Sequence, residues 1–165
     1  MQPNHEQKEQ KGGESMRKAY PIIFLLVIGL ATTGLAAGKS FMATLSGSEV
    51  VPPVTTPAKG EATFELSKNG KKLSYKVTIS DIENVTAAHI HMGKVGEAGP
   101  PLVPIKIKGK KGKASGKGTI TSKDLIGSFA GKTVKDLVAE IEAGNTYLNV
   151  HTGKYPDGEI RGQIK

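Results

Sequence analysis

Residues 61–80, which read EATFELSKNGKKLSYKVTIS, decide the fold class of this chain. Apolar residues alternate with polar ones on both sides of Asn69-Gly70, and they are Phe64, Leu66, Leu73, Tyr75, Val77 and Ile79. A period of two is typical of strands that bury one face, and Asn-Gly favours the positive φ angles of a tight hairpin turn. The stretch therefore predicts a β-hairpin between Glu61–Ser67 and Lys72–Ser80.

Similar runs elsewhere in the chain make this hairpin part of a larger β fold. The further predicted strands are Ser40–Ser46, Val85–Met92, Leu102–Lys108, Ala114–Thr121, Asn145–Thr152 and Glu159–Ile164. We expect a mostly β fold, an immunoglobulin-like or Greek-key β-sandwich or barrel of about seven or eight strands.

One stretch between residues 122 and 144 changes to helical spacing. Its apolar residues fall at i, i+3, i+4 and i+7, and they are Val134, Leu137, Val138 and Ile141. Thr133 and Asp136 are placed as a capping box, and Gly144 follows as a stop signal. The pattern predicts one short crossover helix.

The composition narrows the class of protein. The 165 residues suffice for one ordinary domain and an N-terminal segment. The 21 glycines and 9 prolines suit short strands joined by turns. Because the chain has no cysteine, disulfides, zinc–thiolate sites, iron–sulfur clusters and thiol nucleophiles are excluded. Any metal must be held by nitrogen and oxygen ligands.

The N-terminal residues have the pattern of an export signal. Residues 1–15 are polar and are interpreted as a disordered extension or a misassigned start. Residues 16–38 are predicted to be a signal peptide, with a basic start at Met16-Arg17-Lys18, an apolar centre and small residues at 35–38. The alternative is an uncleaved membrane anchor, because a span needs about 20 apolar residues. We expect residues 39–165 to form one domain, secreted or in the periplasm or cell envelope.

The chain has a net charge of +8, and many of its lysines are close together. Nucleic-acid binding is one interpretation of Lys106, Lys108, Lys110, Lys111, Lys113 and Lys117. A solvated hairpin of two edge strands fits better, because the run lacks interleaved aromatic residues and the protein is expected to be exported. We therefore expect no nucleic-acid partner, and membrane contact only through an uncleaved N-terminal segment.

Three histidines are the main candidates for chemistry in residues 39–165. His89 and His91 are two positions apart on a predicted strand, so their imidazoles project from the same face. If the last hairpin neighbours that strand, His151 supplies a third nitrogen, and Asp157 or Glu159 an accessory oxygen. Such ligands suit copper, zinc, nickel or iron. In the alternative interpretation, the imidazoles only hydrogen-bond to nearby groups and order the loops.

Other residues favour structural roles. No serine lies in a Gly-x-Ser-x-Gly elbow, which argues against a Ser-His-Asp hydrolase. Arg161 is the only arginine in residues 39–165, which suggests a fixed geometric role such as a bidentate pair with a carboxylate, for example that of Glu49 or Asp157. Tyr147 and Asn149 are expected to pack in the same region.

Four segments carry a resemblance to a known family. They are FMATLSGSEVVPPV (41–54), AAHIHMG (87–93, ending at Gly93), AGNTYLNVHT (143–152) and YPDGEIRGQ (155–163). In this order they resemble the chordin-type domain, the CHRD family, over about residues 40–165. The resemblance implies an immunoglobulin-like β-barrel or sandwich outside the cell, with an undefined biochemical role and an unknown extracellular or envelope partner.

The segment His89-Ile90-His91 is also similar to the His-x-His strand that supplies copper ligands in Cu/Zn superoxide dismutases. Three hypotheses follow. The first is an exported, non-enzymatic binding or structural module that holds copper or zinc at His89, His91 and His151. The second is a copper-dependent oxidoreductase resembling superoxide dismutase. The third is a purely structural envelope or matrix module that binds no metal.

Overall fold

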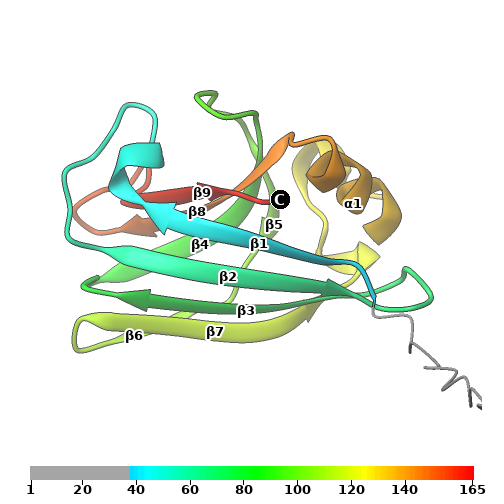
Figure 1. The fold of residues 1–165 in the computed structure, drawn as a ribbon, viewed down its shortest axis with the longest axis horizontal. Coiled ribbons are helices and arrows are strands. Elements are labelled where there is room, and N and C mark those ends of the chain that lie inside the picture. The colour runs from blue at the N-terminus through cyan, green and yellow to red at the C-terminus, as the bar shows by residue number, and fades with distance from the viewer. Residues whose placement is uncertain (1–37) are drawn as a thin grey trace, which may run out of the picture. The chain divides into compact units, whose positions relative to one another are not determined.

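Nine antiparallel strands form one curled sheet in the computed structural model, which describes residues 38–165 (Figure 1). The strands are β1 (Ser40–Ser46), β2 (Lys59–Leu66), β3 (Leu73–Ser80), β4 (Val85–Met92), β5 (Pro101–Pro104), β6 (Lys108–Lys110), β7 (Lys113–Ile120), β8 (Thr146–Thr152) and β9 (Ile160–Gln163). Their order across the sheet is β5-β4-β8-β9-β1-β2-β3-β7-β6. The mostly β prediction is confirmed, and its barrel alternative fits the curl better than two separate sheets.

The extension expected over residues 1–15 and the signal peptide or anchor expected over residues 16–38 lie outside the described residues, except for Gly38. Among the helices that are described, none combines the length and the apolar character needed to cross a membrane.

The first and last strands join the two parts of the sheet. Strands β1, β2 and β3 form a meander that continues into β7, while the hairpin β8–β9 pairs with β4. Ser46 on β1 pairs with Arg161 on β9, and Met42 and Lys165 exchange two backbone hydrogen bonds of 2.7 and 2.9 Å. This seam brings β8 and β9 beside the meander.

The hairpin at Asn69-Gly70 is confirmed, with Leu66 paired to Leu73. Only Gly70 of the two has a positive φ, +70°. The reason is that the loop runs from residue 67 to 72 and is held by the Asn69 side chain. Its Oδ1 accepts hydrogen bonds from Ser67 and from the backbone of Lys71. The turn is therefore longer than the two-residue turn that Asn-Gly favours.

The helix is also where the helical spacing predicts it, at α1 (Val134–Glu142). Thr133 and Asp136 form the expected capping box, and the apolar face of α1 is buried in the core. The helix lies in the connection from β7 to β8, two strands that are far apart in the sheet order. It is therefore a crossover connection, at one end of the sheet (Figure 1).

The predicted strand Leu102–Lys108 is divided in the structure. Its first part, β5, pairs with β4, and its last part, β6, pairs with β7 at the other edge of the sheet. Between them, the crossing segment, residues 105–107, leaves one edge and reaches the other. The buried residues of this stretch are Leu102, Val103 and Ile105, whereas all three residues of β6 are exposed. Nine strands are therefore found where seven or eight were expected.

The crossing segment is fixed by Tyr75 on β3. Its hydroxyl accepts a hydrogen bond from the backbone N–H of Lys106 (3.1 Å), and the Lys106 carbonyl oxygen lies 3.4 Å from it. Strand β7 leaves space for this contact because a Cβ atom at Gly118 would lie 2.7 Å from the Tyr75 hydroxyl, and one at Gly116 would overlap the Lys106 carbonyl. Glycine in a strand often marks such a close approach.

We expect Tyr75→Phe to lower the free energy of unfolding by about 1–2 kcal/mol, because a half-buried backbone N–H loses its partner. Chemical denaturation measures the change. Tyr155→Phe is the matched control, since its hydroxyl makes one exposed hydrogen bond to the Thr55 carbonyl. Equal losses in the two variants would show that Tyr75 does not stabilise the crossing segment.

Candidate metal centre

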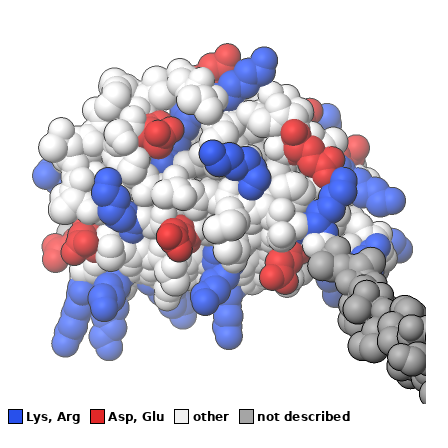
Figure 2. All heavy atoms as spheres, in the orientation of Figure 1, with Lys and Arg blue, Asp and Glu red and all other residues white. Residues whose placement is uncertain are grey.

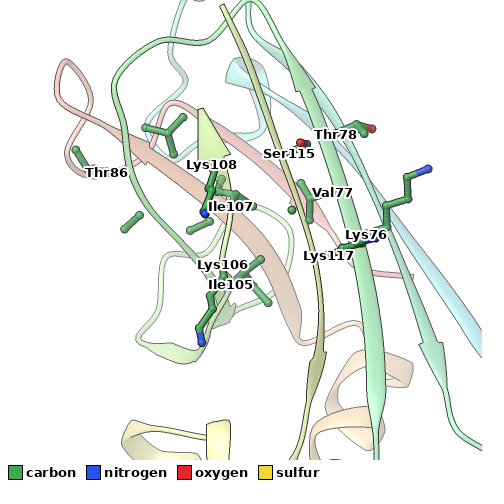
Figure 3. A pocket seen from close by; sticks show the side chains of 14 residues that line it. Lys76, Val77, Thr78, Thr86, Ile105, Lys106, Ile107, Lys108, Ser115 and Lys117 are labelled. Carbon is green, nitrogen blue, oxygen red and sulfur yellow. The ribbon is translucent and has the colours of Figure 1, made fainter. Parts of the chain in front are cut away.

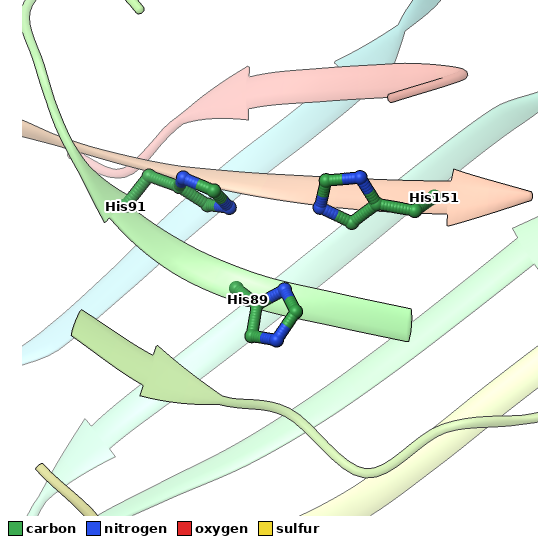
Figure 4. A group of neighbouring side chains, drawn as sticks. All are labelled: His89, His91 and His151. Carbon is green, nitrogen blue, oxygen red and sulfur yellow. The ribbon is translucent and has the colours of Figure 1, made fainter. Parts of the chain in front are cut away.

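Three imidazoles meet on the outer face of β4 and β8 (Figure 4). In the register of these strands His89 pairs with Asn149 and Ala87 with His151, so His151 is the diagonal neighbour of His89. The ring centroids are 5.6 Å apart for His89 and His91, 5.4 Å for His89 and His151, and 5.7 Å for His91 and His151. The conditional expectation that the last hairpin lies beside β4 is met.

Hydrogen bonds to backbone carbonyls orient two of the rings. Nδ1 of His91 lies 2.8 Å from the Gly99 carbonyl oxygen, and Nδ1 of His151 lies 2.8 Å from that of Pro156. A carbonyl accepts only, so each Nδ1 carries the proton when the ring is neutral, and each Nε2 has a free lone pair. Metal-bound histidines commonly donate their second N–H in this way.

One nitrogen of each ring is buried without a hydrogen-bond partner: Nδ1 of His89, Nε2 of His91 and Nε2 of His151. One ligand atom can be chosen on each ring so that all three atoms lie within 4.8 Å of one another. Zinc–imidazole bonds measure about 2.0–2.1 Å, which places ligands of a tetrahedral ion about 3.4 Å apart. Small ring movements would therefore suffice to bring the three nitrogens to one ion.

The surroundings of His89 and His91 favour their neutral forms. Burial is the main cause that lowers the pKa of His91 from its usual 6.5 to about 4; charges on His151, His89 and Arg161 add to it, and the hydrogen bond to Gly99 opposes it. Burial, with a smaller effect of His151, also lowers the pKa of His89. A neutral imidazole is the form that binds a metal, so proton competition at neutral pH is weak.

Arg161 holds the loop beside the histidines. Its guanidinium donates hydrogen bonds of 2.7 Å to the backbone carbonyls of Glu97 and Lys94, and only 3% of the residue is exposed. The expected carboxylate partner is thus replaced by two carbonyls, whose spacing in the loop also fits the planar fork of the guanidinium. These bonds attach the loop after β4 to the outer face of the sheet.

A stack of side chains connects Arg161 to His91. The guanidinium carbon lies 3.5 Å from the ring centroid of Tyr147. The Tyr147 ring is stacked on His91, with centroids 5.1 Å apart and 17° between the planes. The Tyr147 hydroxyl accepts a hydrogen bond from the N–H of Gly99, whose carbonyl contacts His91. Arg161 and Tyr147 therefore fix the orientation of His91.

The other predicted structural residues lie in the same layer. Gly93 starts the loop with a φ of +148°, and a Cβ there would lie 3.0 Å from the Tyr147 ring. Asn149 donates a hydrogen bond to the Asp157 carbonyl (3.0 Å), which holds the β8–β9 turn. These contacts place Gly93 and Asn149 around the histidines rather than among them.

The two accessory carboxylates are placed differently from the three rings. Asp157 is exposed in the β8–β9 turn. Glu159 is buried, and its two oxygens accept hydrogen bonds from the hydroxyls of Thr56 (2.6 Å) and Thr152 (2.7 Å). Among the described residues, the group that could hold an ion consists of the three histidines alone.

Gln163 is a contributor that the sequence analysis did not single out. Its amide donates hydrogen bonds to the carbonyls of Gly93 (3.0 Å) and Gly144 (2.7 Å). These bonds connect the residue after β4 and the segment before β8 to β9. The sequence could have indicated Gln163, because it lies two residues after Arg161 and therefore on the same face of a strand. The roles of the Gly99 and Pro156 carbonyls could not be predicted from the sequence, because every residue carries a carbonyl.

The lowered pKa of His91 predicts a pH-dependent stability of the metal-free protein. Between about pH 6.5 and pH 4 the unfolded chain binds a proton that the folded protein does not, so the free energy of unfolding falls as the pH is lowered through this window. The full loss is on the order of 3 kcal/mol. Denaturation at several pH values measures the free energy of unfolding. In His91→Gln the fall between about pH 6.5 and pH 4 should vanish, whereas Tyr155→Phe should keep it. The same pH dependence in both variants would show that His91 is not its cause.

Arg161→Lys should lower the free energy of unfolding by about 2–3 kcal/mol, because an ammonium cannot keep both hydrogen bonds and the stacking on Tyr147. Amide hydrogen exchange should accelerate at residues 93–99. The matched control is Lys132→Ala, which removes an exposed cation over the Phe129 ring. If exchange in the loop stays slow in Arg161→Lys, the guanidinium does not hold it.

Comparison with known proteins identifies the family of this chain. The CHRD domain family matches residues 41–164. Chordin of Xenopus laevis is 29% identical over 128 residues, which cover 73% of this chain and 12% of chordin, so the chain spans a small part of that relative. No solved structure matches the chain. Since the match takes in almost the entire described sheet together with the histidines and Arg161, the chain belongs to the CHRD domain family.

Proposed function

We propose that this CHRD domain is a non-enzymatic binding module that holds one copper or zinc ion between His89, His91 and His151. The observation that carries the proposal is the set of three buried imidazole nitrogens that face one another without hydrogen-bond partners. A buried polar atom without a partner costs on the order of 1–3 kcal/mol. A bound cation would satisfy all three atoms at once.

The donor set supports a transition metal. Calcium and magnesium prefer oxygen ligands, whereas imidazole suits zinc and copper. The hydrogen bonds from Nδ1 of His91 and His151 to carbonyls are the outer contacts that orient metal-binding histidines. When bound, the ion would supply Lewis acidity, and copper would also supply redox chemistry.

A purely structural role for the histidines explains less of the site. The Nδ1 contacts of His91 and His151 would order the loops after β4 and β8 without any metal. They do not explain why the opposite nitrogens are buried and directed toward one another and toward His89. A loop-ordering histidine needs only one partner, and its other nitrogen can face water.

A copper-dependent oxidoreductase is the second candidate. A depression of about 400 Å³ lies over the three rings, with Pro101, Gly153 and Pro156 at its sides. An ion held there by three imidazoles would keep a coordination position for an exchangeable ligand. The copper-loaded protein would then consume superoxide faster than an equal amount of His91→Gln protein with copper.

We also propose that the domain acts outside the cytoplasm, secreted or within the cell envelope. The support is the basic, apolar and small-residue pattern of residues 16–38. The mass of the protein recovered outside expressing cells tests this, since cleavage near residues 36–38 would remove the preceding segment. Its extracellular or envelope partner is unidentified.

Calorimetric titration of the full chain, free of any affinity tag and stripped of metal, tests the site with Zn(II) and Cu(II). We expect one ion per chain. His89→Gln, His91→Gln and His151→Gln should each weaken binding by more than about 100-fold, because the loss of an outer contact alone typically costs about 10–100-fold.

Glu159→Gln is the matched control for this titration. Its carboxylate binds two threonines, so the substitution should lower stability and leave metal affinity unchanged. A variant that carries all three histidine substitutions serves as the reference for nonspecific binding. If it binds the metal as tightly as the wild type, the metal site is refuted. In that case the histidines would have only the structural role.

A further inference from the structure

A second candidate site lies between the two edges of the curled sheet, and none of the three histidines lines it. A pocket of about 960 Å³ opens between β4, β7 and the crossing segment (Figure 3). Its inner lining is aliphatic and includes Val77, Val85, Ala88, Ile105 and Ile107. Small-molecule sites commonly measure about 300–1,000 Å³ and are mostly apolar.

The pocket exists because the crossing segment leaves β4 before it joins β7. The N–H of Ile105 still bonds to the Ala88 carbonyl, whereas Lys108 already pairs with Ser115. The two edges therefore diverge and are not hydrogen-bonded to each other along their whole length. Val85 and Ile107 remain only partly buried against the core, so the gap leads from solvent to apolar side chains.

The rim of this pocket is positively charged. Four lysines line it, Lys76, Lys106, Lys108 and Lys117, and no aspartate or glutamate does. Figure 3 shows Lys106 and Lys108 on the side of the pocket where Thr86 lies, whereas Lys76 points away. Figure 2 shows lysines projecting along the side of the molecule where Figure 1 places β6 and β7.

These lysines form no salt bridge within residues 38–165, although the charge of Lys106 acts on Asp124. The one salt bridge in that part of the chain joins Lys39 to Glu142. Lys76 and Lys117 even lie directly opposite each other on β3 and β7, an arrangement of like charges that weakens a sheet. Lys76 and Lys117 project from the face of β3 and β7 opposite to Val77, so the charges nearest to the opening are those of Lys106 and Lys108.

We propose that the pocket binds a single-chain anionic amphiphile, a long-chain carboxylate. The acyl chain would lie against Val85 and Ile107, the partly buried aliphatic residues of the lining, and the carboxylate would lie between the ammonium groups of Lys106 and Lys108. An apolar interior and a cationic rim are the two properties that such a ligand matches at once. A nucleic acid matches only the rim, because the lining carries no aromatic ring for base stacking.

The pocket and the histidine site are independent, although both use β4. Ala88 and Ile90 face the core, whereas His89 and His91 project from the opposite face of the same strand. Neither proposal needs the other to hold. Titrations with metal and with amphiphile therefore fail or succeed separately.

The test is titration of the full chain with palmitate below its micellar concentration, followed by calorimetry and by NMR of the ¹³C-labelled carboxylate. We expect saturable binding of one palmitate per chain. Lys106→Gln/Lys108→Gln should weaken it about 3- to 30-fold, the effect of losing two exposed ion pairs. Hexadecyltrimethylammonium, which has the same chain length and the opposite charge, should bind at least about tenfold more weakly than palmitate.

Ile107→Glu places a negative charge in the lining and should weaken binding at least about tenfold, and a melting curve shows whether this variant stays folded. If Ile107→Glu does not fold, Lys106→Gln/Lys108→Gln still tests the proposal, because both lysines are exposed. Lys68→Gln/Lys71→Gln, the same change of charge in the β2–β3 loop, is the matched control and should bind like the wild type. Absence of saturable binding, or an affinity equally reduced in both lysine pairs, would overturn the proposal.

Discussion

The buried guanidinium of Arg161 is the interaction on which the outer layer of this domain depends. A β-sheet that faces water needs only one apolar face, but β4, β8 and β9 carry a second packed layer on their outer side. Arg161 makes that layer possible because it satisfies two loop carbonyls and supports Tyr147, which in turn supports His91. Three of the four segments that resemble the family meet there: 87–93, 143–152 and 155–163.

Local patterns in the sequence predicted much of the fold, and pairings between distant segments account for what they missed. Alternation placed His89 and His91 on one face because the side-chain period of a strand is a property of the strand alone. The approach of His151 required β8 to lie beside β4, which could be stated only as a condition. The division of Leu102–Lys108 could not be predicted, since the sequence alternation of Ile105 and Ile107 with lysines runs through the crossing segment without a break. The partners of Arg161 were also unpredictable, because backbone carbonyls have no sequence signature.

Strand β4 shows how one segment can serve two sites. Its odd-numbered residues His89 and His91 form the histidine cluster, and its even-numbered residues Ala88 and Ile90 face the core. The carbonyl of Ala88 accepts a hydrogen bond from Ile105 on the neighbouring segment. After Ile105 the chain turns toward β7, which leaves the lysine-rimmed opening. An insertion of one residue in β4 would exchange the two faces. Both sites would then be lost together, although none of the three histidines lines the lysine-rimmed opening.

The seam between β1 and β9 makes the assembly of this sheet depend on its last strand. The meander β1–β3 needs only neighbours that are close in sequence, but the outer edge of β1 stays open until Ile160–Gln163 and Lys165 have been synthesised. Until then, a nascent chain exposes an unpaired strand edge, and the histidine layer lacks the strand that carries Arg161. Contacts of such high contact order form slowly. A chain that ended before β9 would therefore leave the outer edge of β1 unpaired and the loop after β4 without Arg161.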